Sequence, residues 1–163
     1  MSDLITGEGR LKQTPGQMVA LLRGHRLRCR TAILLVSPSQ IAEALNIAAR
    51  LGLDAVDYHE VLVRSLPPGA KFVPLTAASE ETRLDTIAEQ PVGADAVLVY
   101  NFDLAVAKLE HRQRALLWST LRDRLPHRRR ALVLAMPLGA ERLLPADGEL
   151  VGWQEGRLAA WGD

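Results

Sequence analysis

Cysteine is nearly absent from this chain of 163 residues, in which Cys29 is the only one. No disulfide can therefore form within the chain, and this favours a reducing compartment such as the cytoplasm. The four histidines are scattered, and none has the spacing of a zinc-binding helix. We expect no bound metal and no cofactor.

Long hydrophobic runs are absent as well. No stretch approaches the roughly 18 consecutive apolar residues of a membrane-spanning helix, and the opening sequence MSDLITGEGRLKQTPG lacks the apolar core of a signal peptide. We therefore expect a cytoplasmic protein with no membrane attachment. The length suits one domain over residues 1–163 with a core of its own.

What the sequence does contain is a regular alternation of two hydrophobic patterns. Continuous apolar runs predict buried strands at 31–36, 53–58, 94–100 and 131–136. Helical spacing predicts helices at 38–51, 59–66, about 79–90 and 109–125. This alternation predicts an α/β fold with a mostly parallel sheet flanked by helices. Residues 1–30 are expected to form a leading helical segment, and 149–161 a short C-terminal β-hairpin.

The stretch AILLVSPSQIAEAL, residues 32–45, begins like a nucleotide-binding domain but lacks the phosphate loop. Neither a glycine-rich loop nor a lysine lies between the expected strand and helix. Ser37, Pro38 and Gln40 instead predict ordinary helix capping, as N-cap, first-turn proline and capping-box glutamine. Gly52 is expected to end this helix.

A second departure lies at the end of a later strand, in VLVYNFDL, residues 97–104. A nucleoside triphosphatase has an acid here that holds the magnesium ion. In this chain Tyr100 takes the place of that acid, and Asn101 and Asp103 follow. The apolar pattern of the strand is therefore kept while the metal-holding group is lost.

Together these segments resemble the small P-loop proteins called BrxF, accessory components of BREX bacteriophage-defence systems. The corresponding segments are AILLVSPSQIAEAL, AVLVYNFDL, the helix through Trp118 and Leu121, LPHRRR and ALVLAMP, over about residues 31–140. The resemblance implies a P-loop NTPase-like fold of the RecA or AAA type. It also implies an accessory or scaffolding subunit that binds a larger protein partner in a multi-subunit defence complex.

Five residues occupy the positions of the nucleotide site that the resemblance implies. Asn101 and Asp103 match the family pattern, whereas Ser37, Ser39 and Gln40 stand where glycine, lysine and threonine would bind phosphate. Hydrolysis is not expected, because phosphate charge and magnesium both lack their usual counter-groups. Weak nucleotide binding at the helix N-terminus is one alternative.

The sequence is also compatible with two other classes of function. The chain resembles the SulA inhibitors in size, in its SPSQ start and in AARLGLD, and would then be a RecA-like cell-division or SOS regulator without a nucleotide site. An enzyme with an unfamiliar site is the other alternative.

Arginine is concentrated in two segments, RGHRLRCR at 23–30 and HRQRALLWSTLRDRLPHRRR at 111–130. Such patches bind DNA phosphates or acidic partners. The candidate contact residues are Arg23, Arg26, Arg28, Arg128, Arg129 and Arg130. The last three are expected in an exposed turn with no role in the core, and alternatively they form only a solvated surface. Self-association of the chain is left open.

Overall fold

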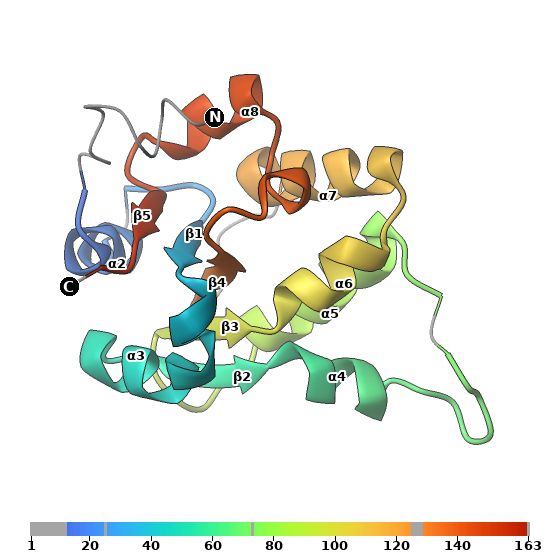
Figure 1. Ribbon diagram of the computed structural model, residues 1–163. Helices are drawn as coiled ribbons and strands as arrows, with labels where there is room; N and C mark the ends of the chain where they lie inside the picture. The colour runs from blue at the N-terminus through green and yellow to red at the C-terminus, as the bar shows by residue number, and fades with distance from the viewer. Residues whose placement is uncertain (1–12, 25, 73, 125–128, 163) are drawn as a thin grey trace.

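The computed structural model describes residues 13–24, 26–72, 74–124 and 129–162 (Figure 1). In chain order its elements are α2 (Pro15–Arg23), β1 (Thr31–Val36), the 3₁₀ helix η1 (Pro38–Glu43), α3 (Ala44–Leu51), β2 (Asp54–Asp57), α4 (Tyr58–Arg64), α5 (Ala77–Ala88), β3 (Ala96–Tyr100), α6 (Phe102–Lys108), α7 (His111–Asp123), β4 (Ala131–Pro137), the 3₁₀ helix η2 (Glu141–Leu143), α8 (Asp147–Trp153) and β5 (Leu158–Ala160). The four apolar runs are confirmed as strands β1 to β4.

The strands form a single parallel sheet in the order β2-β3-β4-β1-β5. Ile33 of β1 pairs with Leu134 of β4 on one side and with Leu158 of β5 on the other. All of β1 is buried, as expected for a strand with helices on both faces of the sheet. The predicted α/β fold with a parallel, helix-flanked sheet is therefore confirmed.

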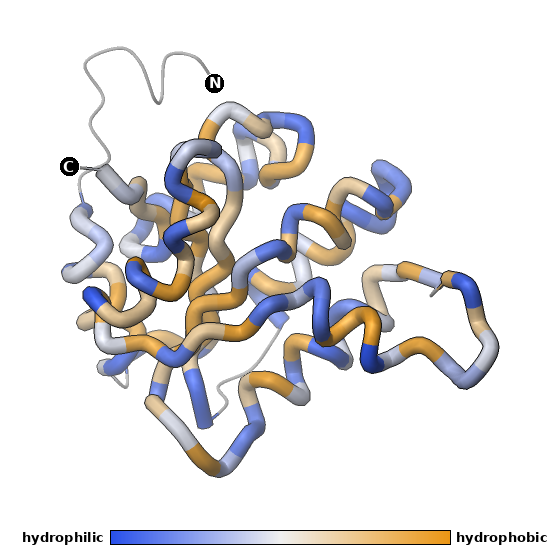
Figure 2. Tube along the Cα trace, turned by 60° about the horizontal axis from the view of Figure 1, so that its bottom comes forward, coloured by the Kyte–Doolittle hydropathy of each residue, from blue (hydrophilic) through white to orange (hydrophobic). Residues whose placement is uncertain are grey.

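Successive residues of a strand enter two different cores, because side chains alternate between the faces of a sheet. Ile33 and Leu35 pack with residues of α4 to α8, whereas Leu34 and Val36 pack with residues of α2 and α3. Figure 1 shows α2 and α3 on one side of the sheet and α5, α6 and α7 on the other. In Figure 2 the hydrophobic stretches run through the centre of the trace, along the strands.

The few aromatic side chains are concentrated in the larger core. Tyr58 and Phe102 have ring centroids 5.1 Å apart, Phe102 and Trp118 6.0 Å, and Trp118 and Trp153 5.9 Å, all edge to face. This geometry is favourable for aromatic pairs. The row joins α4, α6, α7 and α8 on one face of the sheet.

Two predictions about secondary structure were wrong. The C-terminal β-hairpin at 149–161 does not form, since α8 occupies 147–153 and β5 lies parallel to β1. Leu150 and Trp153, three residues apart, are buried on one face of α8. The separate helix α6 was not predicted, and the helix predicted at 109–125 is α7. The leading helix is confirmed as α2, and residues 1–12 lie outside the described part of the chain.

Candidate functional site

The segment after β1 forms a tight 3₁₀ turn, at the point where a nucleotide-binding domain would have its phosphate loop. Ser37 makes no capping hydrogen bond with its side chain, and its Oγ lies 3.1 Å from Oγ of Ser39. The backbone N–H of Gln40 donates to the carbonyl of Ser37 at 2.8 Å. The predicted capping box at Ser37 and Gln40 is therefore wrong, because the chain continues as η1 and the α-helix begins only at Ala44.

The segment after β3 is fixed by a hydrogen bond to the neighbouring strand. Asn101 adopts a left-handed conformation with φ +60°, and its Nδ2 donates to Oδ1 of Asp57 at 2.9 Å. The same oxygen accepts the backbone N–H of His59, at the start of α4, at 2.9 Å. Asn101 therefore joins the carboxyl ends of β2 and β3 and has a structural partner.

Two titratable groups at this edge have shifted pKa values. Burial is the main reason that the pKa of Tyr100 is raised, and the nearby carboxylates of Asp57 and Glu60 raise it further. Burial also raises the pKa of Asp103, although hydrogen bonds from the backbone N–H groups of Asp103 and Leu104 act in the opposite direction. Both side chains are only partly buried.

A small hollow lies between these two segments, at the edge of the sheet where the resemblance to BrxF implies a nucleotide site. Apolar side chains line most of it, with Tyr100, Asn101 and Asp103 at its border; the apolar residues are Val36, Ile41, Ala44, Ile47, Leu98 and Ala135. The space accessible to the centre of a water molecule is about 10 Å³. That is roughly enough for one water. Ligand sites usually have about 300–1,000 Å³, so the hollow that η1 and α3 border is closed to a ligand of nucleotide size.

The five predicted nucleotide-site residues therefore lie at one edge of the sheet without converging on a ligand position. Asn101 and Asp103 border the hollow, whereas Ser37, Ser39 and Gln40 do not line it. In the described part of the chain, no group of three or more histidine, cysteine, aspartate or glutamate residues is arranged to hold a metal ion.

At the opposite edge of the sheet, where the strands begin, buried arginines form hydrogen bonds that connect neighbouring segments of the chain. Arg30, Arg130 and Arg157 directly precede β1, β4 and β5, and all three are buried. Nε of Arg157 donates to the carbonyl of Thr31 at 2.8 Å, and its guanidinium lies 4.6 Å from the ring centroid of Trp153. Nε of Arg30 donates to the carbonyl of Leu22 at 2.7 Å.

The six arginines predicted to contact DNA or a partner do not form one exposed patch. Arg130 is 5% exposed and pairs with Asp54, so the expectation that it has no role in the core is wrong. Nε of Arg23 lies 2.8 Å from Oδ1 of Asp95. Arg26, Arg28 and Arg129 are exposed, and Arg128 lies outside the described residues.

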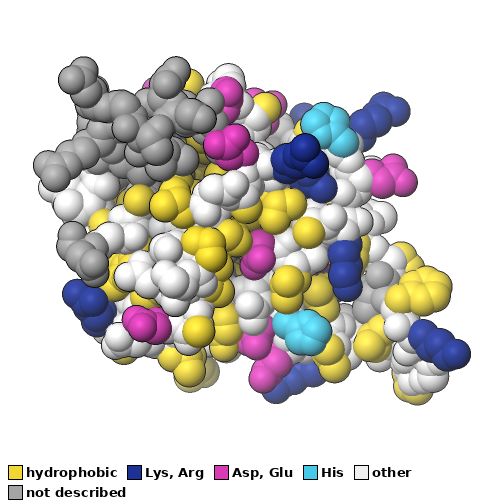
Figure 3. Space-filling view, viewed as in Figure 1, with side chains coloured by type: hydrophobic (Ala, Val, Ile, Leu, Met, Phe, Trp, Pro, Cys, Tyr) yellow, Lys and Arg dark blue, Asp and Glu magenta, His cyan; other side chains and the backbone are white. Residues whose placement is uncertain are grey.

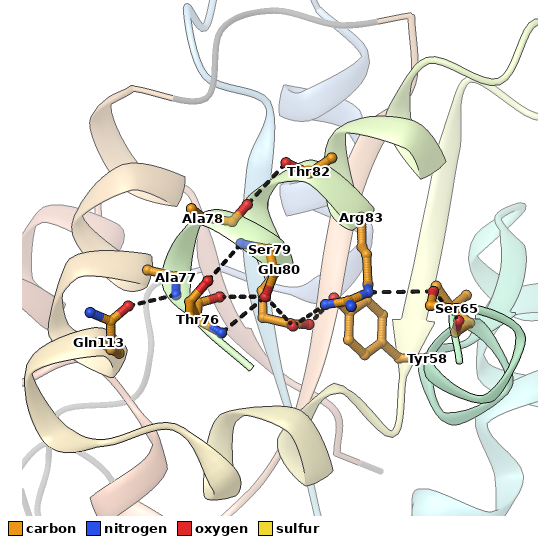
Figure 4. A network of polar contacts seen from close by, with 11 residues as sticks. Tyr58, Ser65, Thr76, Ala77, Ala78, Ser79, Glu80, Thr82, Arg83 and Gln113 are labelled. Atoms are coloured by element: carbon orange, nitrogen blue, oxygen red, sulfur yellow. Dashed lines mark hydrogen bonds and ion pairs between the residues drawn. The ribbon is translucent and has the colours of Figure 1, made fainter. Parts of the chain in front are cut away.

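Sequence reasoning missed a buried polar network between α4 and α5 (Figure 4). Glu80 is fully buried and accepts hydrogen bonds from the Tyr58 hydroxyl, from Arg83 and, at 3.1 Å, from Ser79. Arg83 also reaches Oγ of Ser65, at the end of α4, at 3.4 Å. Since every oxygen of the carboxylate has a partner, the network fixes α4 against α5.

The sequence did carry a signal for this network. Glu80 is spaced four and seven residues from Leu84 and Ile87, which places it on the buried face of α5. A carboxylate on such a face requires partners, which are Tyr58 of α4 and Ser79 and Arg83 of α5 itself.

Comparison of the chain with protein-family models, with curated proteins and with solved structures finds no match. Among the described residues, every helix is too short or too polar to cross a membrane.

Proposed function

We propose that this chain is a non-catalytic, protein-binding subunit of a bacterial phage-defence assembly of the BREX type, built on a P-loop NTPase-like domain that has lost its nucleotide position. The BREX-type assembly is inferred from the resemblance of the sequence to BrxF. The order of the strands supports the P-loop NTPase-like domain, and the closed hollow at the carboxyl edge supports the loss of its nucleotide position.

The order of the strands supports a sheet of the RecA or AAA type. In that type, one strand separates the strand that leads into the phosphate loop from the strand that carries the metal-holding acid. Here β4 lies between β1, which leads into η1, and β3, which ends at Tyr100. The two segments that resemble BrxF therefore face each other across β4, as the resemblance implies.

The closed hollow is the observation on which the proposal mainly depends. Ile41, Ala44 and Ile47 cover the carboxyl ends of β1, β3 and β4 with apolar surface. A triphosphate at this position would lose its hydration without gaining a lysine or a bound magnesium ion. Nucleotide-driven chemistry is therefore disfavoured, and binding to another macromolecule is the remaining role for an accessory domain.

A protein is favoured over DNA as the main partner. Arg23 and Arg130, two of the six candidate arginines, are held by Asp95 and Asp54. Their charge is already compensated, so they are poor contacts for DNA phosphates. In this proposal the exposed Arg26, Arg28 and Arg129 contact DNA, and this contact contributes less to binding than the protein partner does.

Co-expression with the components of a BREX-type system tests the proposed function. We expect the tagged chain to co-purify with one component in a fixed ratio. The complex should survive nuclease treatment, and it should not change when ATP and magnesium are removed. If no component co-purifies, or if the complex requires ATP, the proposal fails.

A further inference from the structure

A groove lies between α4, the loop that follows it and the end of α6. Its lining includes His59, Leu62, Val63, Lys71, Phe72 and Lys108, and its volume is about 300 Å³. In Figure 3 hydrophobic side chains are exposed beside Lys and Arg side chains at the lower right, over the segment that follows α4 in Figure 1. The groove shares no lining residue with the closed hollow, which lies beside η1 and α3.

The hydrophobic residues of the groove are unusually exposed. Phe72 is 78% exposed, whereas the only other phenylalanine, Phe102, is fully buried. Val63, on α4, is 52% exposed. Large apolar side chains that are exposed next to one another on a protein surface are typical of an interaction site.

The charged side chains that line the groove are positive. Among the described residues, its lining contains the cations Lys71 and Lys108, together with His59 and apolar side chains, and no carboxylate. Glu60, which is the neighbour of His59 on α4, pairs instead with Arg64 at 3.3 Å. An occupant with carboxylates is therefore complementary to this groove.

The helix α4, which forms one wall of the groove, is held in place before anything binds. Tyr58, at the first turn of α4, and Ser65, just after its end, both contact the network of Glu80 and Arg83 on α5 (Figure 4). A groove whose wall is already ordered loses less conformational entropy on binding.

We infer that this groove binds an acidic amphipathic helix of the protein partner, with large apolar residues on one face and carboxylates flanking them. The inference rests on the proposed function, because it names the surface and the chemistry of the partner. A helix suits the groove better than an extended peptide does. The lining consists of side chains of α4, α6 and a loop, with no strand edge to pair with an extended backbone, and a helix satisfies its own backbone hydrogen bonds.

Selection from a displayed library of helical peptides with randomised surface positions tests this inference on the full chain. Enriched peptides should carry glutamate or aspartate beside apolar residues spaced three or four positions apart. The most enriched peptide, synthesised with a fluorescent label, should bind less tightly as salt is increased. A library that yields no binder, or only neutral or basic binders, overturns the inference.

Matched variants then locate the binding site. Phe72→Ala and Val63→Ser should each weaken binding of the enriched peptide about tenfold. Val151→Ser is the control for Val63→Ser, since Val151 is a 55% exposed valine on α8, outside the groove. Lys71→Glu should weaken binding, whereas Arg142→Glu, at an exposed position of η2 outside the groove, should leave it unchanged. Equal effects of the groove variants and their controls would contradict the inference.

Other occupants give different results. Concentration-dependent self-association that Val63→Ser abolishes would assign the groove to a second copy of the chain. Binding to vesicles of phosphatidylserine, without binding to acidic helices, would assign it to a lipid surface. Either result overturns the inference. If a BREX component co-purifies equally with the wild type and the Phe72→Ala variant, the proposed function stands and only the inference fails.

Discussion

Asp54 and Arg130 form an ion pair that spans the amino end of β3, with Oδ2 of Asp54 2.8 Å from Nη2 of Arg130. Asp54 begins β2 and Arg130 directly precedes β4, and β3 lies between these two strands in the sheet. The same carboxylate oxygen accepts the backbone N–H of Ala94 at 2.8 Å, and Nη1 of Arg130 donates to Oε1 of Gln90 at 3.0 Å. Arg130 therefore connects three segments at this edge.

Replacing Arg130 with alanine is expected to destabilise the protein by about 2 kcal/mol, because it removes a buried cation and leaves its partner groups unpaired. This loss of stability is small for a buried ion pair, since Asp54 is partly exposed and water can replace part of its interaction with Arg130. Urea unfolding followed by circular dichroism measures the change.

Arg129 is the matched control for Arg130, since it is the preceding residue and is exposed. Arg129→Ala should change the free energy of unfolding by less than about 0.5 kcal/mol. Equal effects at the two positions would show that the ion pair with Asp54 does not stabilise the sheet.

The arginines also show the limit of what the sequence predicts. Runs of apolar residues correctly predicted the strands β1, β3 and β4, because a strand that is buried on both faces must be apolar throughout. The residue that precedes such a strand has no comparable signal. In the sequence Arg129 and Arg130 are equivalent members of one charged run, and only the pairing of β2, β3 and β4 brings Asp54 to one of them.

Removing the hydroxyl group of the residue that precedes α5 or η1 should change the stability of the protein by different amounts. Thr76 caps α5 through a capping box with Ser79, whereas Ser37 makes no side-chain capping bond. Thr76→Ala should therefore cost about 1 kcal/mol of stability, and Ser37→Ala less than about 0.5 kcal/mol. Thermal and urea unfolding of the two variants compare them directly. A larger loss for Ser37→Ala would indicate a role for Ser37 that its contacts do not explain.

The candidate site could be predicted only in part. The missing lysine and the tyrosine at position 100 are visible in the sequence, whereas the position of both segments at one edge of the sheet is known only from the structure. The filling of the hollow was not predicted, because it depends on η1 turning Ile41 toward β1 and β3. The mistaken hairpin has a similar cause, since Leu150 and Trp153 suit a strand as well as a helix until their neighbours are known.

Stability at alkaline pH should depend on Tyr58. Burial, together with the Glu80 carboxylate, raises the pKa of its hydroxyl far above the ordinary value. In the unfolded chain this group ionises near pH 10. The folded state keeps the proton, so the contribution to stability is complete below about pH 10 and is lost as pH rises further, with a slope of up to about 1.4 kcal/mol per pH unit.

Tyr58→Phe removes this titration and also a hydrogen bond to a buried carboxylate. It should cost about 2 kcal/mol at pH 7, and the difference from the wild type should become smaller between about pH 10 and 11. Urea unfolding at several pH values measures both effects. A difference that is constant with pH would show that the Tyr58 hydroxyl ionises equally in the folded and unfolded states.

The central claim is that the nucleotide position is closed, and thermal melting with and without millimolar ATP and magnesium tests it most directly. A ligand that binds the folded state stabilises it by RT ln(1 + [L]/Kd), so a ligand that does not bind leaves Tm unchanged. The closed hollow beside Ile41, Ala44 and Ile47 predicts that Tm does not change within the error of the measurement. A rise of several degrees that depends on the concentration of ATP would contradict the account.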